Sequence, residues 1–113
     1  MTTDKTGAPT TVSAADGKYT IAVEGKTVGH TAIADRDNQR VFYHTEIDDE
    51  FGGRGLATIL VREALDATRA EGKRIVAVCQ MVAGVLEKHS EFKAISDPVT
   101  PEIERWTQTL PTA

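Results

Sequence analysis

Cysteine is nearly absent from this 113-residue sequence, and the single Cys79 excludes an internal disulfide. Small domains that depend on disulfides carry several cysteines, so a lone thiol favours a reducing, cytoplasmic setting. Aromatic residues are also scarce, at 5%. No apolar run approaches the roughly 20 residues that span a bilayer, and the polar residues 1–8 lack the apolar core of a signal peptide. We therefore expect a cytoplasmic protein with no membrane partner.

An excess of basic residues is missing as well. The sequence has 13 Lys and Arg against 17 Asp and Glu, a formal net charge of −4. Proteins that bind nucleic acid usually carry a basic excess that displaces counterions from phosphates, so we expect no nucleic-acid partner. The length leaves no room for a second catalytic domain or for a barrel of about 250 residues. One small globular domain is expected.

The first half of the sequence predicts an antiparallel meander that follows a polar segment. Residues 1–17 show neither the period of a strand nor that of a helix, so we predict a flexible N-terminal tail. Alternating apolar residues and β-branched side chains predict three strands, over residues 18–24, 26–33 and 41–47. Glu24-Gly25 and the polar residues 35–39 supply the turns between them.

The second half predicts helices around one buried strand. Apolar residues recur at helical spacing over residues 55–71, and Gly72 ends this helix. The apolar run 74–78 predicts a strand that pairs parallel with the strand ending at Ile47, because a helix intervenes. Shorter helical patterns cover residues 80–89 and 102–107, the second anchored by Trp106. The fold class is α+β: an antiparallel meander, a glycine loop, a long helix, a parallel strand and a short helix.

Three glycines stand among the four residues Gly52-Gly53-Arg54-Gly55, where the third strand meets the long helix. Glycine permits unusual backbone angles, and the helix start directs N–H groups and its positive dipole end at this loop, which suits a phosphate. The Arg54 side chain could add a positive charge. The loop lacks the Lys-Ser/Thr of triphosphate-binding loops and the third glycine of the dinucleotide fingerprint. A turn that only lets strand and helix pack is the alternative.

The order of these motifs resembles the GNAT superfamily of N-acetyltransferases, whose pyrophosphate site reads Gln/Arg-x-x-Gly-x-Gly/Ala at a helix start. Glu50 replaces the first residue of that pattern here. The sequence is most similar to a small branch, the YjdJ-type single-domain acetyltransferases, and departs from it at Gln80, Met81 and Ser90. The residues that carry the resemblance, over residues 18–92, are His44-Thr45-Glu46-Ile47, Phe51-x-Gly53-Arg54-Gly55-Leu56-Ala57, Leu60-Val61-x-x-Ala64-Leu65, Arg69-x-x-Gly72, Cys79 and His89-x-Glu91-Phe92.

The resemblance implies an acetyl-CoA site between the strand ending at Ile47 and the strand ending at Val78, with CoA as the product. In such proteins these two strands splay apart, and the pantetheine arm adds to the exposed edge like a further strand. Backbone N–H groups of the glycine loop hold the pyrophosphate. The positions implied as cofactor contacts are Thr45, Glu46, Ile47, Gly52, Gly53, Arg54, Gly55, Leu56, Ala57, Cys79 and His89.

Two side chains are candidates for catalysis. Glu46 could take a proton from an incoming ammonium, and a solvated strand-end carboxylate is the alternative. Cys79 could act as an acid near the thioester sulfur; a covalent acetyl carrier and a small buried apolar residue are the alternatives. His44 could orient the acceptor or pack beneath the sheet, and His89 could contact cofactor or end a helix. His30 has no assigned role, and we expect no metal site because the His and Cys residues show no paired ligand spacing.

These assignments divide the sequence into a flexible tail over residues 1–17, a GNAT-like acetyl-CoA-binding domain over residues 18–95 and a C-terminal extension over residues 96–113. We expect an acetyl-CoA-dependent N-acetyltransferase in which an unidentified amine, of a protein, peptide or small molecule, attacks the thioester directly. The short segment after Phe92 motivates one alternative, a non-catalytic CoA-binding module. A protein-interaction domain with a plain glycine turn is another. We expect a monomer or a weak homodimer.

Overall fold

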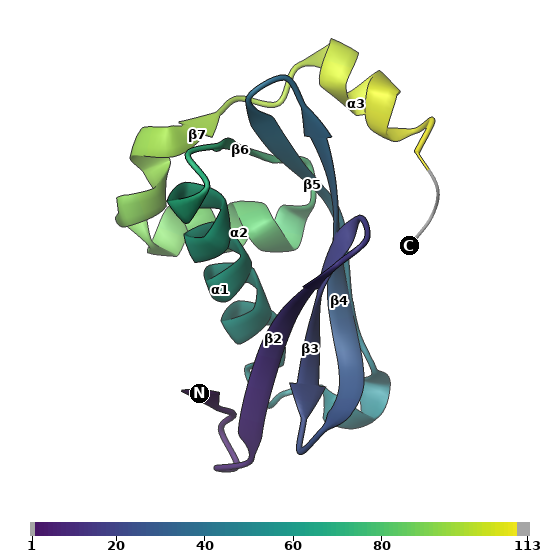
Figure 1. The fold of residues 1–113 in the computed structure, drawn as a ribbon, viewed down its shortest axis with the longest axis vertical. Coiled ribbons are helices and arrows are strands. Elements are labelled where there is room, and N and C mark those ends of the chain that lie inside the picture. The colour runs from purple at the N-terminus through teal and green to yellow at the C-terminus, as the bar shows by residue number, and fades with distance from the viewer. Residues whose placement is uncertain (1, 111–113) are drawn as a thin grey trace.

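One seven-stranded sheet organises the computed structural model, which describes residues 2–110 (Figure 1). The strands lie side by side in chain order. They are β1 (Thr2–Thr3), β2 (Pro9–Ala15), β3 (Lys18–Val23), β4 (Lys26–Arg36), β5 (Gln39–Ile47), β6 (Arg74–Ala77) and β7 (Ser96–Asp97). The helices are α1 (Leu56–Ala70), α2 (Gln80–Lys88) and α3 (Pro101–Thr107), with the short 3₁₀ helices η1 (Asp49–Phe51) and η2 (Ser90–Ile95). The predicted α+β class is confirmed.

The predicted three-stranded meander is confirmed as β3, β4 and β5, which pair antiparallel. Glu24 and Gly25 both have positive φ, 50° and 86°, as in the two-residue turns whose twist matches that of a hairpin. Asp37 adopts φ 55° in the second turn. β4 runs to Arg36, past the predicted end, because the polar residues before the turn still pair with β5. Both predicted turns therefore connect the strands as expected.

The prediction of a flexible tail over residues 1–17 is wrong for residues 9–15. These form β2, which pairs antiparallel with β3, and the short β1 pairs with β2. The segment contains one large apolar residue, Val12, which packs against the core, and a buried Thr10. An edge strand needs few apolar residues because most of its side chains face solvent, so its alternation is weak. Met1 lies outside the described residues.

α1 is the central helix of the core. It begins at Leu56 and ends where Gly72 takes a positive φ of 74°, and Gly72 donates its N–H to the Arg69 carbonyl. Its buried side, which packs with Ile21 and Phe42 of the sheet, consists of Leu56, Leu60, Val61, Ala64, Leu65 and Thr68. The predicted helix over residues 55–71 is thus confirmed to within a residue at each end. Within residues 2–110, no helix combines the length and apolar character that crossing a membrane requires.

The predicted parallel pairing of the two halves is also confirmed. β6 runs alongside β5 from the Gln39–Arg74 pair to the Phe42–Ala77 pair. There the ladder ends, because the N–H groups of Val78 and Cys79 both donate to the Phe42 carbonyl, at 3.0 and 2.9 Å. β5 continues to Ile47 without β6, while its other edge stays paired with β4. The two strands therefore diverge beyond Phe42.

α3 covers the sheet face opposite α1. Ile103 packs with Val41 and Val76, and Trp106 lies partly buried against this smaller cluster. Figure 1 shows α3 apart from α1 and α2, beyond the turn between β4 and β5. Thr100 caps the helix by accepting from the Ile103 N–H. The predicted helical turn with Trp106 as its anchor is confirmed, and Pro101 stands at its start. Residues 111–113 of the predicted C-terminal extension lie outside the described residues.

A buried arginine fastens the meander to the end of α1. The Arg40 side chain is 7% exposed and bonds to Asp35 at 2.8 and 3.0 Å and to Glu71 at 2.8 and 3.1 Å. It also donates to the Tyr19 hydroxyl at 2.6 Å. These bonds lower the pKa of Asp35 and of Glu71 and raise that of Arg40. The network therefore fixes the end of the molecule away from the glycine loop.

Candidate functional site

Three elements meet where β5 and β6 diverge. The outer edge of β5 beyond Phe42 faces no strand of the described chain, since β6 has already turned into α2. α2 begins on the far side of this gap, with Cys79 as its N-cap residue. β5 itself leads through η1 and the glycine loop to the start of α1. Topology thus brings the predicted residues 45–47, 52–57 and 79 to one end of the sheet.

Cys79 and Thr45 face each other across this divergence. The Cys79 thiol donates to the Thr45 hydroxyl at 3.4 Å, and the Thr45 and Thr31 hydroxyls lie 2.9 Å apart. Thr31 is fully buried and Cys79 partly buried. Because the Cys79 side chain is only partly buried, it can still contact a group that binds between the strands. Sequence reasoning missed Thr31, because only the register of β4 against β5 places it beside Thr45.

The glycine loop has the backbone shape that the sequence predicts. Gly53 and Gly55 take positive φ values of 77° and 78°, and Gly55 is the N-cap of α1 with no side chain capping the first turn. A Cβ placed on Gly53 would meet nothing within 4 Å, so the backbone here is open to a bound group. Leu56 is buried beneath the loop and Ala57 is partly exposed in the first turn. Such a helix start suits an anion.

The N-terminal segment engages the Arg54 side chain in this structure, and a contact between the positive charge of Arg54 and a phosphate stays a prediction. Its Nε pairs with Asp4 at 2.8 Å and another of its nitrogens donates to the Thr6 hydroxyl at 3.0 Å. Lys5 also donates its N–H to the Arg54 carbonyl at 3.0 Å. The hydroxyl of Thr6 lowers the pKa of Asp4, with further contributions from the N–H groups of Thr6 and Ala8 and from Arg54. Arg54 therefore anchors the N-terminal segment to the loop.

The N-terminal segment supplies residues that sequence reasoning left out of the site. The Lys5 side chain lies over Gly55, where an added Cβ would come within 3.3 to 3.7 Å of its methylene carbons. Asp4, Lys5 and Arg54 line one open groove together with Thr58 of α1. The weak apolar pattern of residues 9–15 gives no sign of the strand β2 that brings this segment back to the sheet. No signal in the sequence pairs Asp4 with Arg54.

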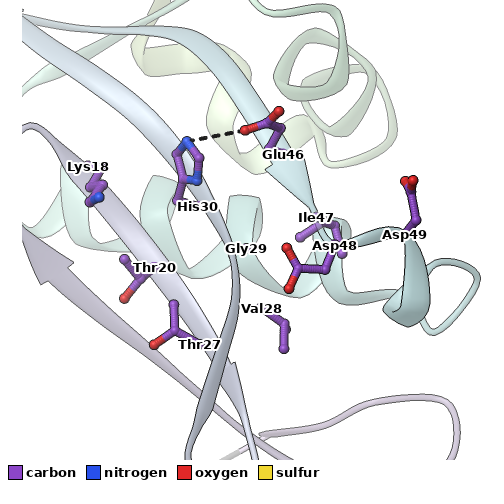
Figure 2. Close-up of a pocket in the computed structure, with 10 residues that line it drawn as sticks. All are labelled: Lys18, Thr20, Thr27, Val28, Gly29, His30, Glu46, Ile47, Asp48 and Asp49. Atoms are coloured by element: carbon purple, nitrogen blue, oxygen red, sulfur yellow. Dashed lines mark ion pairs between the residues drawn. The ribbon is translucent and has the colours of Figure 1, made fainter. Parts of the chain in front are cut away.

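Glu46 lies at the opposite face of the β5 edge. Its side chain is 62% exposed and borders an open pocket of about 420 Å³ that Lys18, His30, Asp48 and Asp49 also line (Figure 2). Ile47 contributes to the same pocket and also packs against the core. A half-exposed carboxylate at a pocket rim can exchange protons with water. Glu46 follows Thr45 in sequence, but its side chain lies on the other face of β5 from the contact between Thr45 and Cys79.

The remaining predicted residues are less closely grouped. Gly52 donates its N–H to the Asp49 carbonyl and ends η1. His44 is partly exposed and lies 3.7 Å from Glu46, on the pocket side. His89 ends α2, about 15 Å from Cys79 by the helix rise, and pairs with Glu91 at 3.9 Å. Its placement matches the helix-end alternative, and a contact between His89 and a cofactor stays a prediction.

A family model described as GCN5-related N-acetyl-transferase matches residues 18–95. The chain belongs to the GCN5-related N-acetyltransferase family. The predicted superfamily and the predicted N-acetyltransferase class are thereby confirmed. The matched residues include β3, β4, β5, the glycine loop, α1 and Cys79, which are the elements that frame the site.

Solved structures of this family's fold resemble the chain. The solution structure of a GCN5-like protein from Staphylococcus aureus is 22% identical, with a TM-score of 0.61, and the match covers 80% of this chain and 91% of that chain. This likeness shows the fold.

Two crystal structures of an aminoglycoside acetyltransferase from an uncultured soil metagenomic sample, with trehalose and with sisomicin, are each 12% identical to this chain. Their TM-scores are 0.45 and 0.46, and the matches cover 88% and 85% of this chain and 60% and 57% of theirs. At those scores they carry no argument about this acetyltransferase. No curated protein sequence matches the chain significantly.

Proposed function

We propose that this acetyltransferase transfers an acetyl group from acetyl-CoA to an amine, with cofactor and amine meeting at the end of β5. One observation carries the proposal: β5 and β6 diverge at Phe42, beside an uncapped helix start in a glycine loop. An unpaired strand edge and a free helix N-terminus are the two features that a pantetheine arm with its pyrophosphate needs. The similarity to YjdJ-type single-domain acetyltransferases supports the same assignment.

The residues at the site fit acetyl-CoA. Backbone groups of Thr45, Glu46 and Ile47 would pair with the amides of the pantetheine arm along the open edge of β5. N–H groups of Gly53, Arg54 and Gly55 would hold the pyrophosphate, and the open space at Gly53 admits it. The Lys5 side chain, which lies over Gly55, adds a positive charge to the same end of α1. Acetyl-CoA supplies an activated acetyl group as a thioester.

Glu46 and Cys79, the two candidate catalytic side chains near Thr45, each carry one proton transfer. Glu46 accepts the proton that the attacking ammonium must lose, directly or through water in the pocket. Backbone N–H groups near Glu46 and Ile47 stabilise the oxyanion as the amine nitrogen bonds to the carbonyl carbon. Cys79 gives its thiol proton to the departing thiolate as the carbon–sulfur bond breaks, and recovers a proton, through water, from the newly acylated nitrogen. The products are the acetylated amine and CoA.

The pocket beside Glu46 suits an amine. Three carboxylates, those of Glu46, Asp48 and Asp49, line it against the single ammonium of Lys18. Charge of this sign attracts a cationic acceptor, and the open rim admits either a small molecule or a side chain of a peptide. A cytoplasmic location suits the unpaired thiol of Cys79.

Isothermal titration with acetyl-CoA and with CoA tests the cofactor site. Gly53→Glu places a negative side chain in the proposed phosphate site, and Gly72→Glu is its matched control at the other end of α1. Both glycines have positive φ (77° and 74°) and neither would meet an atom within 4 Å, so both variants carry similar backbone strain. We expect micromolar binding by wild type and the Gly72 variant, and a loss of at least roughly tenfold for Gly53→Glu. No binding by folded wild type, or equal losses in both variants, would contradict the proposal.

Thiol release in the presence of a panel of amines and basic peptides tests catalysis separately. Saturable release that needs enzyme and amine supports transfer. We expect Glu46→Gln to lower kcat at neutral pH by roughly 10²-fold while acetyl-CoA binding persists, the usual scale for a general base. Binding without turnover by any amine would replace the enzyme with the alternative, a non-catalytic CoA-binding module.

A further inference from the structure

Two histidines and a glutamate gather on the sheet face opposite α1. His30 of β4 pairs directly with Glu46 of β5, and His44 stands two residues before Glu46 on the same strand face. We propose that His30, His44 and Glu46 form a binding site for a divalent transition-metal ion, of which Zn²⁺ is the best match. The observations behind this site do not depend on the proposed acetyl transfer, although both functions would use Glu46.

The distances among these side chains suit a shared ion. Nε2 of His30 lies 4.0 Å from Oε2 of Glu46, and Nε2 of His44 lies 3.7 Å from the same oxygen. The three candidate ligand atoms all lie within 4.8 Å of one another. Zinc bonds of about 2.0–2.1 Å put neighbouring ligand atoms of a tetrahedral site about 3.3 Å apart. Side-chain rotations that move these tips by about an ångström would therefore close the site.

His30 provides a second reason to expect a ligand here. Its side chain is 18% exposed, and its Nε2 atom is buried with no hydrogen-bond partner among the described residues. Figure 2 shows this nitrogen directed at the Glu46 carboxylate. A buried nitrogen without a partner costs free energy that a metal bond would recover. The imidazole rings of His30 and His44 are also close, with ring centroids 6.1 Å apart.

The chemistry of the donors selects the ion. Two imidazole nitrogens and one carboxylate oxygen suit zinc and its neighbours, whereas Mg²⁺ and Ca²⁺ prefer oxygen ligands. Three protein ligands leave further positions for water, and the site opens onto the pocket that Asp48 and Asp49 also line. These two carboxylates raise the local cation concentration more than Lys18 opposes it. A bound ion would hold Glu46 in coordination, so the metal-bound form lacks the proposed base.

The expectation of no metal site rested on the spacing of His and Cys along the chain. His30 and Glu46 are far apart in sequence, and only the antiparallel register of β4 and β5 brings them together. The sequence contains all three ligands, but their grouping is a property of strand pairing. A cross-strand site of this kind has no fixed sequence spacing.

Zn²⁺ titration of the full chain in competition with a chromophoric chelator tests the site. The variants are His44→Gln and Glu46→Gln, both at exposed or half-exposed positions that tolerate change, and His89→Gln is the control. His89 also lies near one glutamate, at 3.9 Å from Glu91, but has no second histidine there. We expect one Zn²⁺ per chain, at least roughly tenfold weaker binding in each ligand variant, and wild-type binding in His89→Gln.

A spectroscopic arm identifies the ligands without relying on mutation. Zn²⁺ should shift the ring resonances of His30 and His44 and leave those of His89 unchanged, while Mg²⁺ should shift none. Co²⁺ should give the visible absorption of a low-coordinate site in wild type and lose it in His44→Gln. Absence of Zn²⁺ binding by the folded wild type would overturn the proposal. Equal losses in the His89 control, or binding that both ligand variants retain, would also overturn it.

Discussion

The Cys79 thiol lies 3.4 Å from the Thr45 hydroxyl, and this contact bridges the gap that opens between β5 and the start of α2. Thr45 in turn lies 2.9 Å from Thr31 of β4. A line of three short polar side chains therefore runs from the core of the sheet to the divergence of the strands. This line places a thiol next to the strand edge where the proposed acetyl transfer occurs.

We predict that Cys79→Ala lowers kcat by about tenfold and leaves acetyl-CoA binding nearly unchanged. The reduction is modest because the leaving group is the thiolate of CoA. An ordinary thiol has a pKa near 8.5, so its thiolate leaves readily with little help from an acid. Steady-state kinetics and titration measure the two effects. Met81→Ala is the control, since Met81 is 43% exposed on the same helix. Wild-type kcat in Cys79→Ala would contradict an acid role, and an acetylated Cys79 in a single turnover would indicate a covalent carrier.

We predict that Arg40→Met destabilises the protein by about 3 kcal/mol. The change leaves Asp35 and Glu71 without their shared cation and removes the donor to the Tyr19 hydroxyl. Breaking a buried ion pair costs about 3–5 kcal/mol, and the partial exposure of both carboxylates places this case at the low end. Urea unfolding followed by circular dichroism gives the free energy. Arg62→Met, on the solvent side of α1, is the control and should change it by less than about 0.5 kcal/mol. A wild-type unfolding midpoint in Arg40→Met would contradict the prediction.

We predict that the free energy of unfolding falls as the pH drops below about 4. Hydrogen bonds from Arg40 lower the pKa of Asp35 and Glu71, and those from Gln39 and Arg74 lower the pKa of Asp97. Carboxylates with depressed pKa values stabilise the fold fully above their unfolded pKa of about 4, and this stabilisation is lost as pH falls through the folded value. Urea unfolding at pH 7, 5 and 3 measures it.

The Arg40→Met variant also separates the contributions to this pH dependence. It removes the main cause of the lowered pKa values of Asp35 and Glu71, although Lys73 still lies near Asp35, and it leaves Gln39 and Arg74 beside Asp97. Its stability should therefore change less with pH than that of wild type, while some dependence persists. A pH profile identical to that of wild type would show that the Arg40 network does not cause the acid sensitivity.

We predict that Gly84→Ala stabilises the protein by about 0.5–1 kcal/mol. Gly84 lies inside α2, and an added Cβ meets no atom within 4 Å, so alanine gains helix propensity without a clash. Gly72→Ala is the opposite case, because Gly72 has a φ of 74° that alanine adopts only with strain. Thermal unfolding should rise for the first variant and fall for the second. The same sign for both would contradict the argument.

Patterns of local origin could be predicted from the sequence. The hairpin at Glu24-Gly25, the apolar stripe of α1 and the end of that helix at Gly72 depend on neighbours in sequence, and all three are confirmed. The parallel pairing of β5 with β6 follows from the intervening helix. The candidate site combined such patterns with a family resemblance, and the roles of its residues stay predictions.

Features that depend on tertiary pairing escaped prediction. β2 presents few apolar side chains because it lies near the sheet edge, and its residues 9–15 gave no clear alternation. The pairing of Arg54 with Asp4, at 2.8 Å, depends on an N-terminal segment that returns to the glycine loop. His30, without any role in the sequence, lies opposite Glu46 only through strand register. Each of these features depends on contacts between segments that are distant in the sequence.

The strands lie in the sheet in the same order as in the chain, and this order affects how the protein folds. Every strand neighbours the one before it in the chain, and helices intervene between β5 and β6 and again between β6 and β7. Contacts of low sequence separation favour rapid folding. The strand pairings of β1 to β5 need no residue that follows Ile47, whereas the core forms only when α1 packs on the sheet. The outer edge of β5 pairs with β6 only as far as Phe42, so the rest of that edge stays unpaired within the described residues.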